Sequence, residues 1–184
     1  MYLGLDLGTS GIKAMLVDDR FATVGVAHAP LSVSRPQPGW SEQDPADWIA
    51  GAEAVIAALL RDHPAAMARL QAIGLSGHMH GAVLLDASDR VLRPCILWND
   101  VRSAAECREL EAAFPALHEI TGNLAMPGFT APKLLWVRRH EPDVFARTAR
   151  VPMTWGELPD DAADLVATLK DRPSGQQVVF TPYG

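Results

Sequence analysis

The N-terminal part of the chain alternates three short apolar stretches with polar turns. The apolar stretches cover residues 2–7, 12–17 and 22–29, and Gly-Thr-Ser-Gly and Asp-Asp-Arg stand between them. Short apolar runs bounded by glycine and aspartate are typical of strands joined by tight turns. The pattern therefore predicts a three-stranded antiparallel meander.

A helix is predicted after a proline-rich loop. Residues 34–45 contain three prolines and a glycine, which favours a loop. Asp44 then offers an N-cap, and Pro45 a proline in the first helical turn. Beyond them apolar residues recur at helical spacing, at Trp48, Ala52, Val55, Ile56 and Leu59. We expect this helix to run to about residue 61 and to cover the sheet.

The middle of the chain mixes further strands with helices. Strands are expected at residues 72–76, 82–85 and 96–98. Helices are expected at residues 102–113 and 132–140. The second of these helices carries Lys133, Trp136 and His140 on one side. This order of elements predicts an α/β or α+β fold.

Composition and charge exclude several classes of protein. Apolar residues make 48% and charged residues 21% of the chain, a balance that allows a buried core. The net charge of −6 disfavours a nucleic-acid partner. No apolar run is long enough to cross a bilayer and no leader is evident, so we expect no membrane partner and a cytoplasmic location. Cys95 and Cys107 form no CxxC motif, so neither a zinc site nor a disulfide framework is predicted.

Asp6 is the first candidate for chemistry. It lies between Leu5 and Leu7 in an apolar strand, where an unpartnered carboxylate would be costly to bury. We expect it to face a cleft, a cation or a set of hydrogen-bond donors. The alternative is that Asp6 only caps the following turn through an Asx-type hydrogen bond.

The turn after Asp6 is a candidate phosphate site. Gly8, Thr9 and Ser10 supply small residues and two hydroxyls, and Lys13 follows closely. Backbone amides in such a turn can approach an anion. The turn is neither a Walker A motif nor a GxGxxG fingerprint, and a plain hairpin turn is the alternative.

Two polar segments suit a polyol. Met79 and His80 lie in a glycine-bracketed loop at a strand end, where α/β proteins often bind ligands. A metal site there lacks a third ligand, so a substrate contact or a structural loop is favoured. Asn99, Asp100 and Arg102 follow Trp98, and together they offer an aromatic face, an amide, a carboxylate and a guanidinium. Core packing of the tryptophan and a helix N-cap at the aspartate are the alternatives.

Five segments together carry a family resemblance. They are Gly-Leu-Asp-Leu-Gly-Thr-Ser-Gly at 4–11, Trp-Ser-Glu-Gln-Asp-Pro at 40–45, Gly-His-Met-His-Gly at 77–81, Ile-Leu-Trp-Asn-Asp at 96–100, and residues 121–136, in which a lysine precedes a tryptophan by three positions. These segments resemble the FGGY carbohydrate kinases, and among them the N-terminal part of bacterial xylulokinases. The resemblance covers about residues 1–151.

The resemblance implies a fold and a reaction. The fold would be the first lobe of the ribonuclease H-like, actin-like ATPases, incomplete here, with a mixed sheet flanked by helices. Members transfer the γ-phosphoryl group of ATP to D-xylulose with Mg²⁺, and homodimers are expected among them. Asp6 would lie at the phosphate and Mg²⁺ end and contact the metal indirectly, and Gly8, Thr9, Ser10 and Lys13 would face the nucleotide phosphates.

On the sugar side, the resemblance implies a pocket lined by five residues. They are Met79, His80, Asn99, Asp100 and Arg102.

The chain also departs from the family pattern. Members carry a general-base aspartate in a Gly-Gly-Asp motif, which this sequence does not contain. Residues 152–184 do not continue the first lobe and resemble a later family segment, displaced or joined by a deletion. We therefore expect 1–151 to form a partial sugar-binding lobe that is inactive alone. The alternatives are a non-catalytic remnant or binding module, and a kinase lobe for another polyol such as glycerol, ribulose or gluconate.

Overall fold

The structure is a computed structural model that describes residues 1–152 and a two-residue strand at 177–178. The described residues belong to two units, each with its own hydrophobic core. Unit 1 contains Met1–Ser32, Ala46–Gly77 and the strand at 177–178, and unit 2 contains Val33–Pro45 and residues 78–152. Most of the segment 152–184, expected as a divergent tail, lies outside the described residues.

Unit 1 is built on a mixed five-stranded sheet. Its strands are β1 (Tyr2–Gly8), β2 (Gly11–Val17), β3 (Thr23–Pro30), β5 (Ala72–Ser76) and β7 (Gln177–Val178). They lie in the order β3-β2-β1-β5-β7. The first three pair antiparallel, which confirms the predicted meander, whereas β5 runs parallel to β1 and β7 parallel to β5.

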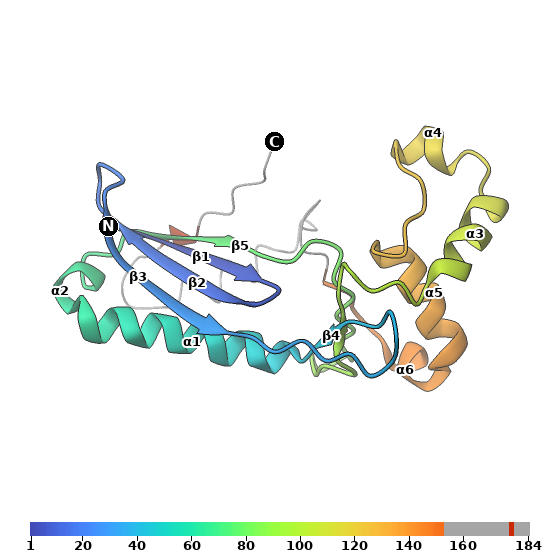
Figure 1. Ribbon diagram of the computed structural model, residues 1–184, viewed down its shortest axis with the longest axis horizontal. Coiled ribbons are helices and arrows are strands. Elements are labelled where there is room, and N and C mark those ends of the chain that lie inside the picture. Colours follow the sequence, from blue (N-terminus) through green and yellow to red (C-terminus); the bar gives the residue numbers. More distant parts are fainter. Residues whose placement is uncertain (153–176, 179–184) are drawn as a thin grey trace. The chain divides into compact units, whose positions relative to one another are not determined.

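One face of this sheet packs on α1 (Pro45–Asp62) and α2 (Pro64–Met67). Figure 1 shows α1 running along the strands. Strand residues such as Leu3 and Leu16 are buried against Val55 and Leu59 of the helix. Every second strand residue faces the helix, and helix residues four positions apart share the face that meets the sheet. Truncating a fully buried leucine such as Leu16 to alanine costs about 2–5 kcal/mol.

Unit 2 is mainly helical. Its elements are β4 (Glu42–Gln43), β6 (Cys95–Ile96), α3 (Ala104–Ala113), α4 (Leu117–Thr121), α5 (Thr130–His140) and α6 (Pro142–Arg147). β4 pairs antiparallel with β6. Its core joins Ala82, Leu84 and Ile96 to Trp136 and Val137 of α5.

Two local predictions for unit 2 were wrong. The segment 82–85 forms isolated bridges, from Ala82 to Ile96 and from Leu85 to Val91, and not a strand. Ala82 and Leu84 of this segment are buried in the core, so an apolar run alone did not distinguish a strand from a core loop. Residues 42–43 were expected in a loop, yet they form β4, because their partner strand lies far along the chain.

Among the described helices, none is both long enough and apolar enough to cross a membrane.

Candidate functional site

A row of polar side chains crosses the unit 1 sheet near the ends of β1 and β5. Cross-strand register pairs His28 with Lys13, Lys13 with Asp6, and Asp6 with Ser76. All four side chains are exposed, on the face opposite the buried leucines of β1. We call these four residues the polar row. Ser76 ends β5, and Asp6 lies two residues before the end of β1, which runs parallel to β5. The carboxyl ends of parallel strands form the edge at which α/β sheets commonly bind ligands.

Asp6 keeps its carboxylate available within this row. Its side chain makes no hydrogen bond to any described residue, so the Asx-type cap, the alternative for this side chain, is not formed. The opposite charge of Lys13 lies directly across the strand pair. A single exposed carboxylate suits Mg²⁺, which retains most of its water ligands.

The turn between β1 and β2 is only two residues long. Gly8 and Gly11 are register partners, which leaves Thr9 and Ser10 as the turn residues. The Ser10 carbonyl accepts a hydrogen bond from the backbone N–H of Leu31. A side chain at Gly11 would place its Cβ 2.7 Å from the Ala29 carbonyl oxygen, so only glycine fits there. The polar row and this turn bring the predicted phosphate-side residues together in one unit.

Asp100 and Arg102 form a buried ion pair in unit 2. The Arg102 Nε donates to Asp100 Oδ1 at 2.9 Å and its Nη2 to Oδ2 at 2.7 Å. Asp100 also accepts the backbone N–H groups of Arg102 and Ser41. The N-cap of α3 is Ser103, so Asp100 is not the cap of that helix. Two-point pairing of this kind fixes both side chains.

The pair belongs to a larger charged network. Arg102 Nη1 lies 2.8 Å from Glu42 Oε1, and Arg93 Nη2 donates to the same oxygen at 2.6 Å. Arg93 Nε also lies 2.8 Å from Glu141 Oε2. The guanidinium of Arg102 stacks 3.6 Å from the centre of the Trp40 ring. The Arg102 guanidinium is therefore enclosed by buried partners, and its two-point pairing fixes the position of the Asp100 carboxylate.

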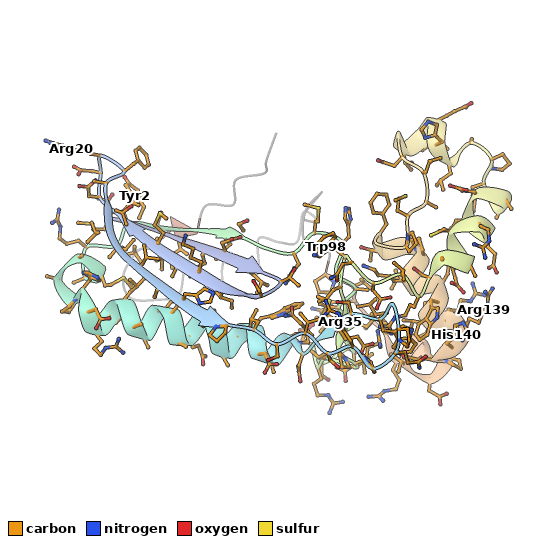
Figure 2. The ribbon with its side chains drawn as sticks, viewed as in Figure 1. Tyr2, Arg20, Arg35, Trp98, Arg139 and His140 are labelled. Carbon is orange, nitrogen blue, oxygen red and sulfur yellow. The ribbon has the colours of Figure 1, made fainter. Side chains whose placement is uncertain are left out.

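Three other residues of the predicted sugar side are exposed. Trp98, labelled in Figure 2, is 49% exposed, and Asn99 beside it is also exposed. Met79 is exposed as well. Core packing, the alternative for Trp98, is therefore not what the structure shows.

His80 has a left-handed backbone conformation and contacts Phe129 and Lys133, which the sequence did not indicate. Its φ of 59° lies in the left-handed region. Its ring centre lies 4.5 Å from that of Phe129, and its carbonyl accepts a hydrogen bond from Lys133 Nζ at 2.6 Å. Partial burial, helped by the positive charge of Lys133, lowers the pKa of the His80 imidazole.

Lys133 is the largest fully buried side chain among the residues that the structure describes. Its Nζ also donates to the Gly128 carbonyl at 2.7 Å. Burial lowers its pKa from 10.5 to about 8, against the opposing effect of Cys95 and Asp100. The same environment raises the pKa of the Cys95 thiol to about 12, chiefly by burial. This burial could not be predicted from the sequence, because lysine is almost always exposed.

The structure thus groups the candidates into two sets, one in each unit. Asp6, the turn and Lys13 lie in unit 1, where register adds His28 and Ser76. The sugar-side candidates lie in unit 2. No group of three or more histidine, cysteine or acidic residues that could hold a metal exists within the described part of the chain.

Comparison with known proteins places the chain in a family. Residues 1–157 match the N-terminal domain of the FGGY family of carbohydrate kinases. The chain belongs to this family.

Relatives within the FGGY family are similar in sequence and in structure. Over 178 residues the chain is 49% identical to the xylulose kinase of Escherichia coli strain K12. The aligned region covers 92% of this chain and 36% of that protein. A crystal structure of a "xyloylose kinase" from Brucella ovis matches with a TM-score of 0.80 at 61% identity, over 83% of this chain and 32% of that one. The xylulose kinase structure from Rhodospirillum rubrum matches with a TM-score of 0.79 at 39% identity, over the same shares.

These neighbours confirm the fold as the ribonuclease H-like, actin-like ATPase lobe of FGGY kinases. The chain spans about a third of the length of the relatives it matches.

Proposed function

We propose that this chain is the sugar-binding lobe of a xylulokinase-type enzyme, which transfers the γ-phosphoryl group of ATP to D-xylulose. The observation that carries the proposal is the pairing of an exposed aromatic face with polar groups in unit 2. Trp98 and Asn99 are exposed directly before the anchored carboxylate of Asp100. A sugar presents C–H groups to an aromatic ring and hydroxyls to such polar groups.

Xylulose is favoured over other polyols by the identity of the relatives. Curated proteins that are 33–49% identical to this chain are xylulose kinases. The glycerol kinase and gluconate kinase structures that share the fold are 18–20% identical to it, which supports the fold alone.

The polar row fits the phosphate end of such a reaction. Phosphoryl transfer needs charge neutralisation at the phosphates and alignment of the two reacting oxygens. Lys13 and the turn at Gly8, Thr9 and Ser10 would neutralise the nucleotide phosphates, and Asp6 would hold a hydrated Mg²⁺. When bound, that Mg²⁺ supplies charge stabilisation to the transferring phosphoryl group.

The chain on its own is proposed to bind sugar without turnover. The sequence has no Gly-Gly-Asp motif, so no residue in it matches the family's general base. Loss of a general base reduces a rate by about 10²–10⁴-fold.

The test is calorimetric titration of the purified chain with D-xylulose, beside a coupled assay of ATP consumption with Mg²⁺ at pH 7. We expect binding heat and no turnover. His80→Ala should weaken the binding, and His118→Ala, which changes an exposed histidine of α4, should not. Tighter binding of glycerol, D-ribulose or D-gluconate would support another polyol kinase lobe. Absence of heat with every sugar would support a non-catalytic remnant, and turnover would refute the proposed inactivity.

A further inference from the structure

Lys133 has no part in the proposed reaction, although it is fully buried and charged. Within the described residues its ammonium makes no ion pair with a carboxylate. Both of its hydrogen-bond acceptors are backbone carbonyls, those of His80 and Gly128. Burying an ammonium without a carboxylate partner carries a large desolvation cost, so we expect a structural reason for its position.

The two carbonyls belong to loops that are distant in sequence. Lys133 lies in the first turn of α5, and side chains of a helix point back toward its N-terminus. That direction brings Nζ to Gly128, which precedes the helix, and to His80, which lies 53 positions earlier in the chain. One ammonium therefore bridges the His80 loop and the Gly128 loop.

His80 needs such an anchor more than comparable residues do. Phe21 and Asp89 share its positive φ, but each closes a reverse turn by donating its backbone N–H to the carbonyl of Asp18 or Asp86. In the described part of the chain, His80 makes no backbone–backbone hydrogen bond. The backbone hydrogen bond that accompanies its left-handed conformation is the one from Lys133.

The Gly128 loop is also fixed against the sugar-side residues. A Cβ at Gly128 would clash with the carbonyl oxygen of Trp98, so the two backbones touch. The rings of Phe129 and His80 are also in contact, with their centres 4.5 Å apart. The segments of His80, Trp98 and Gly128 thus meet around Lys133, all within unit 2.

We propose that Lys133 is a positioning residue that holds the His80 and Gly128 loops together and thereby pre-shapes the sugar-binding surface of unit 2. The effect on sugar binding rests on the proposed function, whereas the effect on the loops does not. If the loops adopt the binding arrangement only part of the time without this lysine, the apparent affinity falls by that fraction.

The test compares the full chain with Lys133→Met, which keeps the length and apolar stem of the side chain. Arg138→Met is the matched control, because it removes a positive charge from an exposed position of the same helix. Hydrogen exchange measured by mass spectrometry reports the loops, and calorimetry with D-xylulose reports the surface. In Lys133→Met, we expect faster exchange at residues 77–82 and 126–130, unchanged exchange in β1 and β2, and affinity weaker by about tenfold or more.

Each outcome decides the proposal. Unchanged exchange in both loops of a folded Lys133→Met chain overturns it, as does an equal effect in Arg138→Met. If the wild-type chain gives no heat with D-xylulose, the proposed function fails and the exchange data alone decide the role of Lys133. If Lys133→Met does not fold, Lys133→Gln, which retains an amide donor, takes its place. Failure of both to fold would make the lysine a core residue and refute the positioning role.

Discussion

Replacing Lys133 by methionine should change how the stability of the chain depends on pH. Burial lowers the pKa of this lysine in the folded chain to about 8, from an ordinary value of 10.5. The unfolded chain therefore holds this proton more tightly, and between pH 8 and 10.5 it binds more protons than the folded chain. Stability rises with pH wherever the unfolded state binds more protons. The lysine thus destabilises the fold at neutral pH, by about 3 kcal/mol, and this penalty fades as pH rises.

The measurable part of this effect lies between pH 7 and pH 9. Integrating the two titrations gives wild type a gain of about 1 kcal/mol in unfolding free energy over that interval, relative to Lys133→Met. The assay is urea unfolding at 25 °C of both chains at pH 7, 8 and 9. The nearby thiol of Cys95, with a pKa raised to about 12, and the charges of Asp100 and Arg102 are common to both chains, so they cancel in the difference. Parallel pH curves for the two proteins would refute the reasoning.

Three further predictions follow from packing. Gly128→Ala should destabilise unit 2 by about 1–3 kcal/mol, because its Cβ would overlap the Trp98 carbonyl oxygen. In the same urea assay Gly74→Ala should be neutral or slightly stabilising, because no atom lies within 4 Å of the added Cβ. Arg102→Lys should cost about 3–5 kcal/mol, since an ammonium loses the two-point pairing and the ring stacking, and an unchanged melting curve would contradict this. Cys95 should resist alkylation by iodoacetamide at pH 8 until urea unfolds the chain, and rapid labelling in buffer would show that the thiol is neither buried nor protonated.

The sequence predicted those elements whose pattern is local. Strict alternation in β1 and β2, and helical spacing after Pro45, specify a buried face directly, so the meander and α1 were predicted closely. The shared side of α5 that carries Trp136 and His140 was also predicted, since the centres of their stacked rings lie 4.8 Å apart. By contrast, β4 was missed because its two residues owe their strand conformation to β6, which lies far along the chain.

The candidate site shows the same division. Asp6, Met79, His80, Asn99 and Asp100 could be named from their types and positions. His28 and Ser76 could be added only from the register of β3 and β5, which depends on long-range pairing. The burial of Arg102 and Lys133 was beyond the sequence, because a charge enters a core only where specific partners compensate it.

The interleaving of the two units has a consequence for synthesis on the ribosome. Residues 33–45 emerge early, between segments of unit 1, but belong to unit 2. The buried side chains of β4 meet their partner strand only when β6 has left the exit tunnel, and the Ser41 amide then meets the Asp100 carboxylate. During that interval unit 1 can close through β5, while the loop that leaves it remains open to solvent and to chaperones. The nascent chain can therefore pair β1, β2, β3 and β5 before it forms the charged, buried network of unit 2.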